Sequence, residues 1–149
     1  MPASHTISPV RFHFLDPGIT LSDRTRLKHF ITLLFKKERK KLAGLNYIFC
    51  SDDYLLDINR QYLQHDYYTD IITFDLSEPD QSINAEIYIS VDRVRDNARQ
   101  FNTSVRQEIH RVIFHGALHL CGYGDKKRSE ELLMRKMEDK YLGLYFRSK

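Results

Sequence analysis

The sequence lacks the features that mark secreted, membrane-spanning or multidomain chains. Its 149 residues contain two cysteines, Cys50 and Cys121, which are too few for a disulfide framework. No run approaches the roughly 18 apolar residues that a membrane span needs, and the start, MPASHTISPVRFHF, has no apolar core of a secretory signal. There is no internal repeat, low-complexity tract or linker rich in Pro, Gly or Ser. These absences predict one domain, residues 1–149, in a reducing cytoplasm without a membrane partner.

The composition is that of an ordinary globular protein, but the positive charge is unevenly distributed. Hydrophobic residues make up 42% and charged residues 29%, and the formal net charge is +3. Residues 24–41 carry eight Lys or Arg against one acid, Glu38, a second basic group spans residues 126–128, and residues 52–86 are acidic. A basic face is typical of polyanion binders. The run KKERKK alone is more typical of a solvated helix face, whereas the basic group at 126–128, beside the expected metal site, favours a polyanion.

Hydrophobic periodicity and capping residues predict nine secondary-structure elements. Their order is strand, helix, strand, helix, strand, strand, helix, helix, helix. The helices are expected to begin after Ser22, Ser51, Ser90, Ser104 and Ser129, and glycines are expected to end the first near Gly44 and the last near Gly143. This order predicts an α+β domain with a small mixed sheet of about four strands and helices packed on it. The expected strands are 10–15, 45–50, 71–76 and 85–90, and the expected helices run from 22 to about 41, 51 to about 63, 90 to about 101, 104 to about 121 and 129 to about 143.

The segment from Glu108 to Asp125 carries the clearest chemical signal. His115 and His119 are four residues apart on the fourth expected helix, so their imidazoles lie on one side, one turn apart. Gly122 can end that helix in a left-handed conformation, and Asp125 can then return as a third ligand. Two histidines and a carboxylate suit zinc, one ion per chain, although manganese or iron also fit. The alternatives are that both histidines are half-buried helix residues and that Asp125 caps the last helix.

The spacing matches the second half of the metzincin peptidase pattern, H-E-x-x-H-x-x-G-x-x-H. Those enzymes use the glutamate after the first histidine as general base, and Gly116 occupies that position here. The metal geometry is therefore retained and a peptidase becomes a distant alternative. Three protein ligands leave a fourth position open, which is typical of catalytic zinc, and bound water then becomes a nucleophile for hydrolysis.

Three further positions complete the expected site. Glu108 falls within roughly 40° of the two histidines on a helical wheel, where it can accept a ring N–H or handle a proton, or can be a surface residue. Thr69 and Asp70 can support the floor of the site by hydrogen bonds, or can form a capped turn. Cys121 is expected to pack, and the remaining histidines have no metal-type position: His5, His13, His29, His65 and His110.

The segment His115-Gly-Ala-Leu-His-Leu-Cys-Gly-Tyr123 resembles the signature H-G-x-L-H-L-x-G-Y of the YbeY endoribonucleases, also called rRNA maturation factors. Upstream, residues 58–62 (INRQY), 69–74 (TDIITF) and 85–90 (AEIYIS) are similar to that family's L-N-x-x-Y, T-D-V-L-S-F and G-D-I-x-I-S motifs, and Glu108 falls on a family glutamate. The resemblance covers residues 52–124 continuously. Two departures stand out: the third ligand position holds Asp125 rather than histidine, with Gly124 in place of aspartate, and Leu63 stands where the family carries an arginine.

The resemblance implies a metal-dependent, single-strand-specific endoribonuclease of rRNA maturation and ribosome quality control. Its partners would be ribosomal RNA and ribosomal particles, with no DNA expected. Lys126, Lys127 and Arg128 are candidates to replace the missing arginine. The main alternative is a non-catalytic RNA-binding assembly factor with a structural metal. The sequence leaves open whether cleavage uses water or the RNA 2′-hydroxyl.

Overall fold

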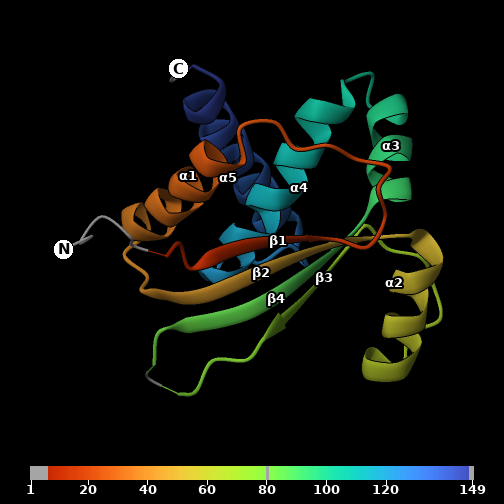
Figure 1. The fold of residues 1–149 in the computed structure, drawn as a ribbon, viewed down its shortest axis with the longest axis horizontal. Helices are drawn as coiled ribbons and strands as arrows, with labels where there is room; N and C mark the ends of the chain where they lie inside the picture. The colour runs from red at the N-terminus through yellow and green to blue at the C-terminus, as the bar shows by residue number, and fades with distance from the viewer. Residues whose placement is uncertain (1–6, 80, 148–149) are drawn as a thin grey trace.

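The computed structural model describes residues 7–79 and 81–147, so that His5 lies outside the described part of the chain. The nine expected elements are present in the expected order (Figure 1). They are β1 (Val10–Phe14), α1 (Arg24–Lys37), β2 (Leu42–Cys50), α2 (Asp52–Ile58) continued by the π-helix η1 (Asn59–Leu63), β3 (Ile71–Asp75), β4 (Ile83–Ser90), α3 (Val91–Gln100), α4 (Val105–Leu120) and α5 (Arg128–Arg147).

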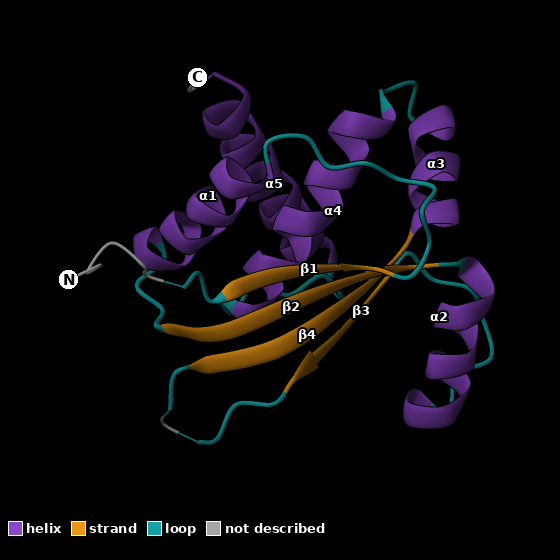
Figure 2. Cartoon of the chain, in the orientation of Figure 1, coloured by secondary structure: helices purple, strands orange, loops and turns teal. Residues whose placement is uncertain are grey.

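The four strands form one mixed sheet in the order β1-β2-β4-β3. β1, β2 and β4 run parallel, and the edge strand β3 pairs antiparallel with β4. Helices α1, α3, α4 and α5 lie on one side of this sheet, whereas α2 lies on the other, as Figure 2 shows by colouring strands and helices separately. This arrangement confirms the predicted α+β class.

Helix α4 is the centre of the core. Its residues Ile109, Ile113 and Phe114 are almost fully buried, and each such side chain contributes about 1.5–3 kcal/mol relative to an exposed one. The helix lies over alternate residues of β2 and β4, which face it because side chains in a strand alternate between faces. The buried hydroxyl of Tyr47 in β2 donates to the carbonyl oxygen of Ile113 at 2.8 Å, which fixes α4 against the sheet.

Gly116 marks the closest approach of α4 to the sheet. A Cβ atom at this position would lie 2.8 Å from Cδ1 of Ile87 and 3.0 Å from Cδ1 of Ile71, too close for van der Waals contact. Glycine therefore allows the helix to approach the strands. The neighbouring His115 faces Glu138 of α5.

Three of the expected serine caps are confirmed. The side-chain oxygens of Ser51, Ser90 and Ser104 accept backbone N–H groups three residues further on, at 3.1, 3.2 and 2.9 Å, and α2, α3 and α4 begin at the following residues. Each such cap stabilises its helix by about 1 kcal/mol.

The limits of α1 differ from those expected. Asp23, not Ser22, precedes the helix; it has a left-handed backbone (φ 56°) and gives no side-chain cap. The helix ends at Lys37 because Arg39 adopts a left-handed conformation (φ 60°) that turns the chain back. Gly44 therefore lies inside β2 and does not end the helix.

Helix α5 also differs from expectation at both ends. It begins at Arg128, so Ser129 lies within its first turn; Oε1 of Glu130 accepts the backbone N–H groups of Lys126 and Lys127, both at 3.1 Å. Its other end continues past Gly143 to Arg147 because Tyr145 is buried against the core. Within residues 7–79 and 81–147, no helix has the length and apolar character that crossing a membrane requires.

Candidate active site

A cavity of about 440 Å³ opens between α3, α4, α5 and the start of β3. Its wall is dominated by ionisable side chains. Five carboxylates face it together with two guanidinium groups and one imidazole, so acids exceed cations. These side chains are Asp70, Glu108, Asp125, Glu131, Glu138, Arg111, Arg135 and His115.

His115 is held by a carboxylate that the sequence analysis did not identify. Oε2 of Glu138, on α5, lies 2.7 Å from Nδ1 of His115, and Oε1 accepts from Nη1 of Arg111 at 2.9 Å. Burial opposes ionisation of Glu138, but the hydrogen bonds and charges of His115 and Arg111 lower its pKa. An ionised Glu138 accepts Nδ1–H and leaves Nε2 of His115 facing the cavity.

Asp125 reaches His115 through a tight turn at the end of α4. Gly122 adopts a positive φ of 109°, as expected, which reverses the chain. Oδ2 of Asp125 then lies 3.3 Å from Nε2 of His115. The turn is held by Glu38, the residue that follows α1; its carboxylate accepts the hydroxyl of Tyr123 at 2.8 Å and also that of Tyr141 on α5.

Burial of the His115 ring favours its neutral form, but the hydrogen bond to Glu138 and the charges of Glu138, Asp70 and Asp125 outweigh it and raise the pKa of His115. The site therefore attracts positive charge at Nε2. A proton or a metal ion can meet this demand, since metal binding displaces protons from its ligands.

His119 lies one helical turn further along α4 and is exposed. Its Nδ1 lies 3.2 Å from the carbonyl oxygen of Tyr123, a contact in which Nδ1–H donates and Nε2 remains available. Both histidines thus carry the kind of hydrogen bond that orients metal-ligating imidazoles. Within residues 7–79 and 81–147, however, no three His, Cys, Asp or Glu side chains lie together as a metal-binding group.

The imidazole and carboxylate groups of His115, His119 and Asp125 are therefore of the types that bind zinc. Their positions in this structure do not form a complete metal site. His115 and Asp125 are in contact. His119 is the ligand that would have to approach them, and an exposed side chain can do so by changing its rotamer.

Glu108 lies in the cavity wall and is 2% exposed, so it is not the surface glutamate that was considered as an alternative. It does not contact His115; the place expected for it is taken by Glu138. Among the described residues Oε1 has no hydrogen-bond partner, but it forms an ion pair with Nε of Arg111 at 3.5 Å. Burial raises the pKa of Glu108 against the opposing charge of Arg111. A buried carboxyl whose pKa is raised can hold or transfer a proton.

Thr69 and Asp70 also line the cavity, at the start of β3. Oδ2 of Asp70 accepts from the side-chain amide of Asn97 on α3 at 3.4 Å. Its backbone carbonyl accepts the N–H of Ser90 at 2.9 Å, which joins it to the end of β4. Burial raises the pKa of Asp70, while the charge of His115 opposes this shift. Asp70 is therefore part of the cavity floor rather than only a turn residue.

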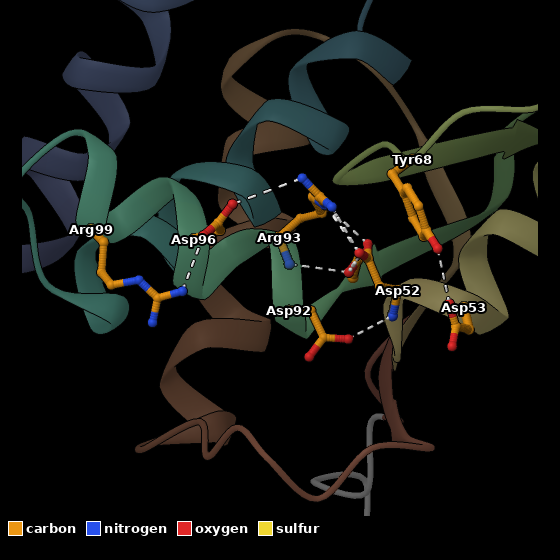
Figure 3. Close-up of polar contacts among 8 residues, drawn as sticks. Asp52, Asp53, Tyr68, Asp92, Arg93, Asp96 and Arg99 are labelled. Atoms are coloured by element: carbon orange, nitrogen blue, oxygen red, sulfur yellow. Dashed lines mark hydrogen bonds and ion pairs between the residues drawn. The ribbon is translucent and has the colours of Figure 1, made fainter.

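A group of ion pairs, drawn in Figure 3, fixes the loop that leads to Asp70. The N-termini of α2 and α3 meet here: the side chain of Asp52 accepts from Nε and Nη2 of Arg93, and Asp92 accepts the N–H of Asp52 at 2.8 Å. The guanidinium of Arg93 lies 5.1 Å from the ring centroid of Tyr68, whose hydroxyl donates to Asp53 at 3.2 Å. Arg93 thereby positions the loop two residues before Asp70.

The remaining candidates lie away from the cavity. Leu63 ends the π-helix and does not line it; neither do Lys126, Lys127 and Arg128. Two arginines that the sequence analysis did not select, Arg111 and Arg135, occupy its wall instead. Cys121 packs in the core as expected. His110 is buried beside α5, and His13 and His65 contact Asn46 and Tyr67.

A small α+β domain with a histidine and several buried carboxylates around one cavity belongs to the class of hydrolytic enzymes in which side chains handle protons or a metal. A family model described as endoribonuclease YbeY matches residues 19–145. The chain belongs to the YbeY endoribonuclease family, which confirms the resemblance seen in its motifs.

Individual relatives agree with this assignment. The chain is 50% identical over 129 residues to an endoribonuclease YbeY of Cytophaga hutchinsonii, covering 87% of this chain and 90% of that protein. It is 55% identical over 105 residues to one of Phocaeicola vulgatus, covering 70% and 75%. A solution structure of a Thermotoga maritima protein matches with a TM-score of 0.63 and 30% identity, over 92% of this chain and 89% of that one.

Proposed function

We propose that residues 1–149 form a single-domain, metal-dependent endoribonuclease that cleaves single-stranded RNA in rRNA maturation and ribosome quality control in the cytoplasm. Ribosomal RNA and ribosomal particles are its partners. The observation that carries this proposal is the cavity in which Glu138 holds Nδ1 of His115, so that Nε2 faces Asp125. Membership of the YbeY family supports RNA as the substrate.

One zinc ion would be held by Nε2 of His115, Nε2 of His119 and the carboxylate of Asp125. When bound, zinc lowers the pKa of a water molecule and polarises a phosphoryl oxygen. Glu138 orients His115, and the buried carboxyl of Glu108 holds or transfers a proton. Arg135, half-exposed at the cavity wall, provides positive charge for a phosphate, a role that Leu63 cannot take.

The alternatives are less well supported. A peptidase of the metzincin kind needs a glutamate after the first histidine; that position is Gly116, where a Cβ atom would lie 2.8 Å from Cδ1 of Ile87 and force it to shift. An assembly factor with only a structural metal has no need of a buried carboxyl in the wall of a cavity, since burying a polar group that lacks a full hydrogen bond costs about 1–3 kcal/mol. Glu108 carries this group.

The test compares wild type with His115→Ala, His119→Ala and Asp125→Ala. Zinc content is measured by elemental analysis after zinc loading, and cleavage of single-stranded ribosomal RNA is followed in the same samples. We expect about one zinc per chain in wild type and loss of zinc together with cleavage in the variants. His29→Ala removes an exposed histidine of α1 and is the matched control, which should retain both.

Wild type that neither binds a divalent metal nor cleaves RNA with added metal would overturn the proposal and favour the assembly factor. Zinc retained in Asp125→Ala would restrict the ligands to the two histidines.

A further inference from the structure

A second cavity, of about 570 Å³, lies outside the active site at the far end of β3. We call it the basic groove. Its walls are the turn from α1 to β2, the loop from β3 to β4, and Leu120 of α4, and Figure 1 shows the turn and the loop at the same end of the sheet. The cations that line it are Arg39, Lys40 and Lys41.

These cations are not a solvated helix face. α1 ends at Lys37, and the three residues belong to a turn with fixed backbone geometry. The N–H of Lys40 donates to the carbonyl of Phe35 at 2.9 Å, and the carbonyl of Lys41 accepts from Ile83 at 2.8 Å. The turn therefore presents all three side chains from a rigid position beside β4.

The three cations of the groove are exposed and have no ion-pair partner among the described residues. Glu38 is the one acid in residues 24–41, and its carboxylate is directed inward to the hydroxyls of Tyr123 and Tyr141. Among the described lining residues the acid is Asp75, which accepts the N–H of Ser77 at 3.0 Å; the same loop also carries Glu78 in its sequence.

The groove and the active-site cavity lie at opposite ends of the same edge strand. Residues 69–71 line the cavity, and Asp75 and Ser77 line the groove. The segment 71–77 spans about 20 Å at roughly 3.3 Å per residue. On α4, Leu120 of the groove directly follows the exposed His119. A single extended polymer can therefore pass His119 and enter both the active-site cavity and the basic groove.

The two cavities carry opposite charge. Five carboxylates against two arginines and His115 make the active-site cavity unfavourable for a polyanion, whereas the described lining of the groove, with three cations and one carboxylate, is more favourable. Binding energy gained away from the reacting bond can hold a substrate over a site that does not attract it.

We propose that the basic groove is a subsite for the phosphodiester backbone of single-stranded RNA, on one side of the cleavage point. This inference rests on the proposed function for its substrate. Lys40 and Lys41 contact phosphates, and the side chains of Ser77, Gln81 and Ser82 line the opposite wall. Binding at the groove is therefore independent of base sequence.

The test is equilibrium binding of a fluorescent single-stranded RNA of about 16 nucleotides, with chelator present to prevent cleavage, at several salt concentrations. Lys40→Ala/Lys41→Ala is compared with Lys136→Ala/Lys140→Ala, which removes the same charge from exposed positions of α5. Each phosphate contact on a single strand contributes about 0.7 to the slope of log affinity against log salt. The first variant should therefore lose about 1.4 from the slope and about tenfold in affinity near 0.15 M salt. The control should match wild type.

Cleavage measured in parallel separates the two proposals. In the groove variant, KM should rise by the same factor with kcat unchanged. If the groove variant has the same salt slope and affinity as the control, and the protein cleaves RNA, the groove proposal is wrong and the proposed endoribonuclease function is retained. RNA binding that depends on Lys40 and Lys41 in a protein that never cleaves would support the groove and refute the nuclease.

Discussion

Replacing Glu138 by glutamine tests whether the active site depends on an ionised carboxylate behind His115. The change keeps the shape of a side chain that is 5% exposed but removes its charge. Glutamine has one acceptor oxygen, whereas Glu138 accepts from both His115 and Arg111 at 2.7 and 2.9 Å. One of these donors must then face an NH₂ group.

The expected loss follows from these contacts. Changing the hydrogen-bond partner of a ligating histidine typically costs 10–100-fold in metal affinity or activity, which is about 1.4–2.7 kcal/mol. The metal-free protein should lose about 1.5–3 kcal/mol of stability, moderated because Arg111 still has Glu108 at 3.5 Å and Asp139 at 3.4 Å.

Zinc affinity is measured by competition with a chromophoric chelator, and stability by urea unfolding with and without zinc. Asp139→Asn is the matched control, because Asp139 neighbours Glu138 and contacts Arg111 but its side chain is 61% exposed. Glu138→Gln with the zinc affinity of wild type and of Asp139→Asn would refute the reasoning.

Three further predictions concern the scaffold. Gly116→Ala should lower the free energy of unfolding by about 1–3 kcal/mol, because its Cβ would lie 2.8 Å from Ile87; an unchanged urea midpoint would contradict this close approach. Gly122→Ala should cost about 1–3 kcal/mol through backbone strain at φ 109°, and it should also weaken zinc binding by displacing Asp125; wild-type zinc affinity would show that the turn does not position this ligand. Burial, with the charges of Arg106 and Arg26, lowers the pKa of His110 although its bond to the Arg106 carbonyl opposes this. The unfolded chain therefore binds this proton more readily, and the contribution of neutral His110 is complete above about pH 6.5 and falls as the pH decreases towards the folded pKa. When urea unfolding is compared at about pH 7.5 and about pH 5, His110→Phe should lack this decrease in stability. The same pH dependence in the variant as in wild type would contradict a contribution from His110.

Local sequence signals predicted the elements whose limits depend on local chemistry. Ser51, Ser90 and Ser104 each stand directly before the first residue of a helix. Their side-chain oxygens cap it by accepting the backbone N–H three residues further on. Limits set by the wider structure were not predictable in this way. α1 ends because Arg39 takes a left-handed conformation despite its side chain, and Gly143 does not end α5 because buried contacts of Tyr145 continue the helix.

The candidate site residues divide in the same way, into those near one another in sequence and those that only the fold brings together. The spacing of His115, His119, Gly122 and Asp125 predicted that the chain returns towards both histidines, and the structure shows a contact of Asp125 with His115. Glu138 lies 23 residues from His115, and no local spacing connects them. A signal was nevertheless present: Glu138 follows Met134 by four residues and precedes Tyr141 by three, so a charged residue occupies a core position of α5.

The position of Glu138 on the last helix has a consequence for the timing of activity during synthesis. Helix α5, residues 128–147, supplies both Glu138 and Arg135 and forms one wall of the cavity. A nascent chain in which His115 and His119 have been made, but α5 is still being translated, has an unoriented histidine and an open cavity. The cavity wall and the hydrogen bond that orients His115 are therefore completed only after α5 has been translated, so any RNA cleavage that depends on an oriented His115 begins only then.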